Sequence, residues 1–194
     1  MAPYKRAPIT EAVIELRLAA PVSQELVEKV KDLLTPEYPL TPEITQSVTM
    51  RSDGKTTIEF IGYRMYSADA ASIVNVQRQS VSTSRLAPYT KWEDFVGRAR
   101  ANWATWRKAV GWQEVARLGV RYINRIDVPN PEEQPIPIER YLRFRPYFPA
   151  FEGSQGMDAF GINAAAGIGN SGFQLILNAG SADSPLVKNT SFLL

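Results

Sequence analysis

Residues 115–128 constrain the fold more than any other segment, because apolar and polar side chains alternate along them over the length of a long strand. The polar side carries Arg117, Arg121 and Arg125, with about 13 Å between successive arginines at about 3.3 Å per residue. The other side, which we expect to face the core, carries Ala116, Leu118, Val120, Tyr122 and Ile126. This alternation predicts a sheet with one buried and one polar face.

The rest of the chain predicts two amphipathic helices and several shorter strands. Apolar residues recur at helical spacing after Pro21 and again after Thr90. The second helix is expected to begin with a capping box of Thr90 and Glu93, to end at Gly111, and to carry Trp92 on its apolar face. Residues 52–55 predict a hairpin turn. Strands are expected at residues 11–18, 44–50, 56–63, 72–77, 80–86, 157–168, 172–178 and from 191 onward.

These elements predict an α+β fold: a curved, mainly antiparallel sheet with two amphipathic helices on one face. Residues 15–21 resemble residues 83–88, which suggests a duplicated unit of strand, helix and three strands, with chance similarity as the alternative. Ferredoxin-like and helix-grip folds are close competitors. We expect a single domain over residues 1–194, interrupted by a proline-rich insertion at about 129–149. The apolar run that ends at Leu194 predicts a C-terminally truncated chain.

The sequence contains no histidine and no cysteine, which narrows its chemistry. Disulfides, thiolate-bound metals and imidazole-based catalysis are excluded. Residues 167–172 resemble a glycine-rich phosphate loop, but they lack the third glycine in register and a following helix, so we interpret them as a hairpin turn. We therefore predict no catalytic residue, cofactor or metal site, with carboxylate, lysine or tyrosine chemistry as the enzymatic alternative.

The charge and hydropathy of the chain predict where it resides. A formal net charge of +2 is too small to indicate a nucleic-acid or membrane partner by itself. The first residues hold no apolar leader, and no apolar run is long enough to cross a bilayer. These features predict a cytoplasmic protein without a membrane partner.

Four short phrases carry a family resemblance: residues 7–12 (APITEA), 62–64 (GYR), 84–89 (SRLAPY) and 117–126 (RLGVRYINRI). In combination they resemble a sporadically distributed bacterial family of uncharacterised proteins, over most of the chain up to about Val128. The resemblance implies a further strand and helix beyond Leu194. It implies no reaction and no catalytic residues.

The three arginines of residues 115–128 are the first candidate binding residues. A guanidinium offers paired hydrogen bonds to a carboxylate or a phosphate, so Arg117, Arg121 and Arg125 could hold an anionic partner. The competing interpretation is an internal ion ladder, in which Glu11 and Glu15 of the first strand pair with these arginines. A mixture of both is the third interpretation.

Three further residues are candidates for binding. Arg85 is expected at the end of a strand beside the positive end of the second helix, where an anion could be held, although a plain strand-to-helix turn also explains it. Tyr122 and the polar Asn124 lie on the apolar side of the long strand and could line a pocket with Trp103.

The leading functional prediction is a non-enzymatic binding or regulatory module whose arginine-bearing sheet face contacts an anionic protein partner or a second copy of the chain. One alternative is a small-molecule sensor with a pocket between helices and sheet. Another is an RNA-binding module, which is weakly supported because few aromatic residues fall on the polar sheet face.

Overall fold

The computed structural model describes residues 7–50, 52–132, 136–143 and 159–194. Their contacts divide the chain into two compact units, Met1–Tyr122 and Ile123–Leu194. The first unit contains β1 (Ile9–Leu18), α1 (Gln24–Leu34), β2 (Glu43–Met50), β3 (Thr56–Tyr66), β4 (Ser72–Gln77), β5 (Ser80–Leu86), α2 (Trp92–Val110) and the first part of β6 (Val115–Pro129). The second contains the rest of β6, the 3-10 helix η1 (Ile138–Arg140), β7 (Gly161–Gly167), β8 (Gln174–Asp183) and β9 (Asn189–Leu193).

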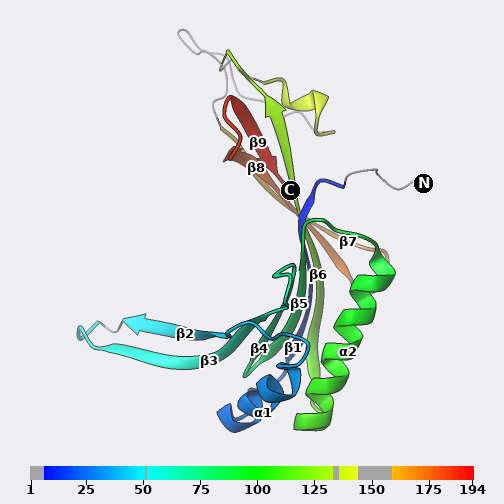
Figure 1. The fold of residues 1–194 in the computed structure, drawn as a ribbon. Coiled ribbons are helices and arrows are strands. Elements are labelled where there is room, and N and C mark those ends of the chain that lie inside the picture. Colours follow the sequence, from blue (N-terminus) through cyan, green and yellow to red (C-terminus); the bar gives the residue numbers. More distant parts are fainter. Residues whose placement is uncertain (1–6, 51, 133–135, 144–158) are drawn as a thin grey trace. The chain divides into compact units, whose positions relative to one another are not determined.

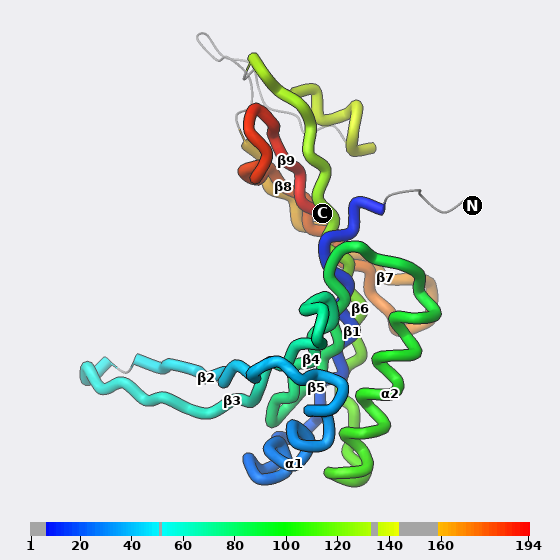
Figure 2. The backbone as a smooth tube through the Cα atoms, viewed as in Figure 1, coloured from blue at the N-terminus to red at the C-terminus, as the bar shows by residue number. Residues whose placement is uncertain are grey.

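The strands of the described residues form one open sheet of nine strands in the order β2-β3-β4-β5-β1-β6-β9-β8-β7 (Figure 1). The pairings between β1 and β5, among β2 to β5, and among β6 to β9 are antiparallel. In the first unit both helices pack on the same side of the strands (Figures 1 and 2). The predicted α+β class is therefore confirmed. The duplication and the single domain stay predictions, and residues 133–135 and 144–149 of the proline-rich insertion lie outside the described residues.

The two helices begin differently from each other and from the sequence expectation. Helix α1 begins after Ser23, whose hydroxyl accepts a hydrogen bond from the backbone N–H of Leu26 at 3.4 Å. Helix α2 begins after Lys91, which makes no side-chain cap. The predicted capping box of Thr90 and Glu93 is therefore wrong, because Thr90 lies one residue outside the cap position. The predicted helix end is confirmed at Gly111, whose φ of +87° suits a residue without a Cβ.

The main core lies where α1 and α2 meet β1, β3, β4 and β5. Trp106 is fully buried there and stacks on Trp103, with ring centroids 4.8 Å apart. Trp92 was expected on the same buried face but is 43% exposed, because it lies in the first turn of α2 and its ring contact is with Phe95. The buried members of this core are Leu18, Val22, Val27, Val30, Leu34, Tyr38, Met65, Val74, Val76, Val81, Trp106 and Ala109.

The β2–β3 hairpin extends well beyond its neighbours in the sheet (Figure 1). Strand β4 pairs only with the last part of β3, from Gly62 to Tyr66, so the outer part of the hairpin is two strands wide. Gly62 lies at this junction, and a Cβ there would lie 2.1 Å from the backbone oxygen of Val76. Because a side chain at position 62 would clash with the backbone of β4, glycine is required at this first residue of the GYR sequence.

The side of β6 that was expected to face the core is largely exposed in the first unit, so the expected burial is wrong for Ala116, Leu118 and Val120. Tyr122 is 36% exposed, but its ring contacts Tyr89, which packs against the cluster that contains Phe95. Leu118 is 57% exposed and Val120 is 49% exposed. The reason is the position of α2, whose Phe95 and Ala99 pack on Ala12 and Ile14 of β1 and leave the first-unit part of β6 outside the buried clusters. In the second unit Ile126 is half-buried, as expected.

A buried polar contact joins α2 to the core. The amide nitrogen of Asn102 donates to the Tyr38 hydroxyl at 2.7 Å and to the Thr83 hydroxyl at 2.8 Å. All three residues are buried, so neither hydroxyl has bulk water to replace the lost donor.

Asn102→Ala should therefore lower the free energy of unfolding by about 2 kcal/mol, because two buried hydroxyls lose their shared donor. Urea denaturation followed by circular dichroism measures the change. Arg98→Ala, on the exposed side of the same helix, is the control and should change stability by less than about 0.5 kcal/mol. An equally small effect of Asn102→Ala would contradict the role of this contact.

Candidate functional site

The outward side of β6 in the first unit carries one ion pair. Arg117 Nη2 donates to Glu15 Oε2 on β1 at 2.9 Å. Strand β1 is the neighbour of β6, so this pair is the cross-strand rung that the ladder interpretation predicts. Both side chains keep substantial exposure, and such pairs contribute about 0.2–1 kcal/mol to stability.

Arg121 differs from Arg117. In the part of the chain that the structure describes, its guanidinium has neither an ion pair nor a hydrogen bond, and the residue is exposed. Glu11, the expected partner, also has no ion pair among the described residues. The predicted ladder therefore has one rung, and Arg121 keeps its hydrogen-bonding capacity for another group.

Arg125 belongs to the second unit and has a different partner. Its Nε donates to Asp127 Oδ2 at 3.2 Å, two residues further along β6. The other carboxylate oxygen of Asp127 accepts from the hydroxyls of Ser184 and Ser191, and these bonds with Arg125 lower the pKa of Asp127. The sequence pattern did not predict this network, because Ser184 and Ser191 lie far from β6 along the chain.

The backbone of β6 is paired on one side over only part of its length among the described residues. On one side β6 neighbours β1; on the other side β9 pairs with it from Arg125 to Pro129, and Asn124 exchanges backbone hydrogen bonds with Leu194. For Val115–Tyr122 no strand partner on this second side is found among the described residues. Successive residues of a strand direct their backbone groups alternately to its two sides, so half of the amides in this stretch face the open side.

Tyr122 is placed among aromatic residues at the start of α2. Its ring meets that of Tyr89 edge to face at 5.8 Å, and the two hydroxyl oxygens are 3.4 Å apart. Tyr89 also contacts Phe95, and burial raises the pKa of the Tyr89 hydroxyl. Trp103 stacks on Trp106 in the main core, and Asn124 belongs to the second unit. The three residues expected to share a pocket therefore each have separate contacts.

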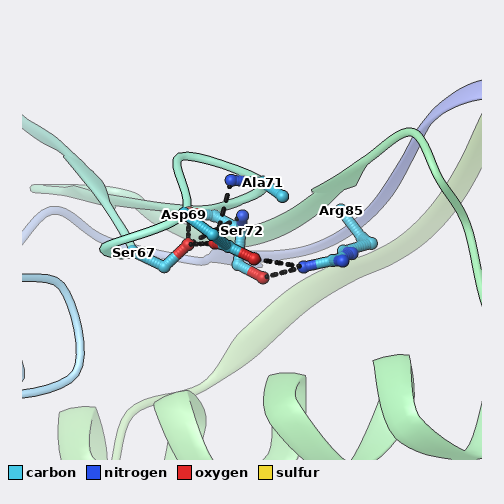
Figure 3. A network of polar contacts seen from close by, with 5 residues as sticks. All are labelled: Ser67, Asp69, Ala71, Ser72 and Arg85. Atoms are coloured by element: carbon cyan, nitrogen blue, oxygen red, sulfur yellow. Dashed lines mark hydrogen bonds and ion pairs between the residues drawn. The ribbon is translucent and has the colours of Figure 1, made fainter.

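Arg85 is held by a turn of its own unit (Figure 3). Its Nη1 lies 3.5 Å from Asp69 Oδ2 and donates to the Ser72 hydroxyl at 3.0 Å. Asp69 also accepts from the Ser67 hydroxyl and from the backbone N–H of Ala71 at 3.0 Å. The guanidinium expected to hold an external anion already binds a carboxylate of the chain, which closes the turn between β3 and β4.

Residues 167–172 form the predicted hairpin turn rather than a phosphate loop. Gly167 at the end of β7 pairs with Gln174 at the start of β8, and φ is positive at Gly169 and Gly172. Among the described residues no group of three or more acidic side chains could hold a metal ion. No described helix is both long and apolar enough to pass through a bilayer.

Comparison of the chain with protein-family models, with curated proteins and with solved structures found no match. The resemblance to the bacterial family therefore stays a prediction.

The turn around Asp69 should make stability depend on pH. Hydrogen bonds from Ser67 and Ala71, together with the charge of Arg85, lower the pKa of Asp69 from its ordinary value of 3.8. A carboxyl whose pKa is lower in the folded state stabilises the protein above its unfolded-state pKa, and this contribution is lost as the pH falls through the folded-state pKa.

Asp69→Asn should therefore lower the urea midpoint near neutral pH, and the difference from the wild type should shrink between about pH 4 and pH 2. Denaturation midpoints measured across this range check the prediction. Glu37→Gln, at an exposed position just after α1, serves as a control. A difference for Asp69→Asn that stays constant with pH would contradict the assignment.

Proposed function

We propose that the protein is a non-enzymatic binding module that contacts an acidic segment of a protein partner through Arg117 and Arg121 on the first-unit part of β6. The observation that carries the proposal is the exposed Arg121 guanidinium, which has no ion pair in the described part of the chain. A carboxylate that binds Arg121 displaces no ion-pair partner among the described residues.

Arg117 supports the same function in a second way. Its pairing with Glu15 at 2.9 Å orients the side chain along the sheet and occupies one of its nitrogens. A guanidinium has five N–H donors, so Arg117 retains donors for a second carboxylate. The two arginines lie two strand repeats apart on one side of β6, which suits acidic residues at matching positions of an extended segment.

The acidic-partner function has more support than the two alternatives. A sensor pocket lined by Tyr122, Asn124 and Trp103 lacks support, because each of these residues has its own separate contacts. RNA binding would need exposed aromatic rings beside the arginines. On the arginine side of β6 the residue between Arg117 and Arg121 is Gly119, which has no ring. The exposed Tyr122 lies on the opposite side of the strand with Leu118 and Val120.

Arg121→Glu should weaken binding of a fluorescein-labelled oligoglutamate peptide by at least about ten-fold, since it replaces attraction by repulsion at the contact. Fluorescence anisotropy at low salt measures the binding. Raising the salt should weaken wild-type binding, because exposed charges are screened.

The matched control is Arg98→Glu, which makes the same charge change on the exposed side of α2. It should retain wild-type affinity within about three-fold, because the overall charge contributes less than the contact. Circular dichroism verifies that both variants fold. Equal losses in the two variants would show that net charge governs binding, and would refute the contact at β6.

A further inference from the structure

We infer that the first unit binds a second copy of the chain, and that the β2 strands of the two copies pair antiparallel along their outer edges. This surface is separate from the arginines of β6, and the inference does not depend on the acidic-partner function.

The position of β2 in the sheet supplies the first part of the argument. Strand β2 stands at the end of the strand order and pairs with β3 on one side, and no described strand pairs with its other side. Backbone groups on such a side are a template for another extended chain. Proteins normally block long edge strands with lysine, proline or a covering element. Glu43–Met50 runs for eight residues and contains neither lysine nor proline.

The apolar side chains of the β2–β3 hairpin supply the second part. Val48 lies opposite Ile58, and nearer the base of the hairpin Gln46 lies opposite Phe60 on the same side. Phe60 packs on the main core, so this is the side on which α1 lies. Farther out the hairpin extends past its neighbours (Figure 1), and Val48, Met50 and Ile58 are each more than 60% exposed. Clustered apolar exposure of this kind marks a protein contact.

A second copy matches this surface by symmetry. A twofold axis perpendicular to the sheet keeps corresponding sides of the two copies together. Antiparallel pairing of two β2 strands therefore places the apolar side chains of one copy beside those of the other. One residue near the middle of β2 then lies opposite its own counterpart, where a charged side chain would meet an identical charge. The middle residues Gln46, Ser47 and Val48 are uncharged.

Charge favours the antiparallel direction. The charged residue of β2 is Glu43 at the base of the hairpin, whereas residues 51–55 at its tip include two basic and one acidic residue, a formal net charge of +1. Antiparallel pairing carries Glu43 of each copy toward the tip of the other, where Lys55 is exposed. Parallel pairing would instead bring the two Glu43 side chains together.

The antiparallel arrangement also accounts for the length of the hairpin. It brings the tip of each hairpin to the base of the other, on the side where the second copy carries its α1. The residues that α1 and the following segment expose include Leu33 and Leu40. Contacts at the two ends of the shared ladder therefore remove from water the apolar side chains that a single copy leaves exposed.

Sedimentation velocity of the full chain tests the dimer. The wild type should dimerise with a Kd of roughly 1–100 μM, because the contact is modest in size. Val48→Glu should raise this Kd at least about ten-fold, since it places two like charges near the twofold axis in an apolar contact. Gln46→Lys, on the same side of β2, is a second disrupting variant.

The matched control is Thr57→Glu. Thr57 is exposed on the neighbouring strand β3 and lies opposite Thr49, on the other side of the hairpin. This variant should change the Kd by less than about three-fold. Circular dichroism verifies that each variant folds. Val48→Glu should also bind the oligoglutamate peptide within about three-fold of the wild type, which separates the two surfaces.

Distances between spin labels test the direction of pairing. The chain contains no cysteine, so one substituted cysteine carries a label at one defined position. Labels on Ser47→Cys should lie within about 20 Å of each other in the dimer, because this position is near its centre. Labels on Lys55→Cys should lie roughly 30 Å apart, because the two tips extend in opposite directions. Electron paramagnetic resonance measures both distances.

Each contrary outcome has a defined meaning. A wild type that stays monomeric at about 0.5 mM would exclude a second copy as the occupant. Unchanged dimerisation of both Val48→Glu and Gln46→Lys, or an equal loss in Thr57→Glu, would exclude the apolar side of β2 as the contact. Labels that lie closer together at Lys55→Cys than at Ser47→Cys would exclude antiparallel pairing. None of these results bears on the acidic-partner function, which the Arg121→Glu measurement tests by itself.

Discussion

The packing of α1 and α2 against one side of the first-unit strands is the interaction on which the rest of that unit depends. It buries Trp106, Val30 and Leu18 almost completely, and each such side chain contributes about 1.5–3 kcal/mol relative to exposure. The polar contacts of Asn102 lie inside this packing and fix how α2 meets β5 and the Tyr38 segment. A core of this kind positions β1, and β1 in turn positions the neighbouring part of β6.

The position of α2 also decides which apolar side chains stay outside the described core. The helix covers the apolar residues of β1 through Phe95 and Ala99, and the buried clusters end there. The next strand therefore presents apolar side chains that the described core does not use. Strand β6 follows α2 directly in the chain, so the helix that builds the core and the strand whose first part it leaves uncovered are consecutive elements.

The arginines show how similar residues acquire different roles from their neighbours. Arg85 and Arg125 bind aspartates of their own unit, and in both cases the aspartate receives further hydrogen bonds that favour its ionised form. Arg117 has an exposed partner, and Arg121 has none in the described chain. The sequence places Arg117, Arg121 and Arg125 at equivalent positions of a repeat, but the facing strand supplies a carboxylate to one of them and not to the next.

The sequence by itself determined the type and order of the elements. Strand alternation and helical spacing are local properties, so the α+β class, the turn before β3 and the end of α2 at Gly111 could be read from neighbouring residues. The sequence also placed Arg117 and Arg121 on the same side of an extended strand, because side chains an even number of residues apart in a strand lie on the same side.

Only the tertiary structure decided which sides are buried and which charges are paired. An apolar side of a strand becomes core only if another element covers it, and α2 covers β1 instead of the first part of β6. The Asp69 and Asp127 networks join residues of different strands and turns, whose meeting depends on sheet order and register. Periodicity gives each strand two sides, but contacts between distant segments determine what each side meets, and these contacts leave Arg121 without an ion pair among the described residues.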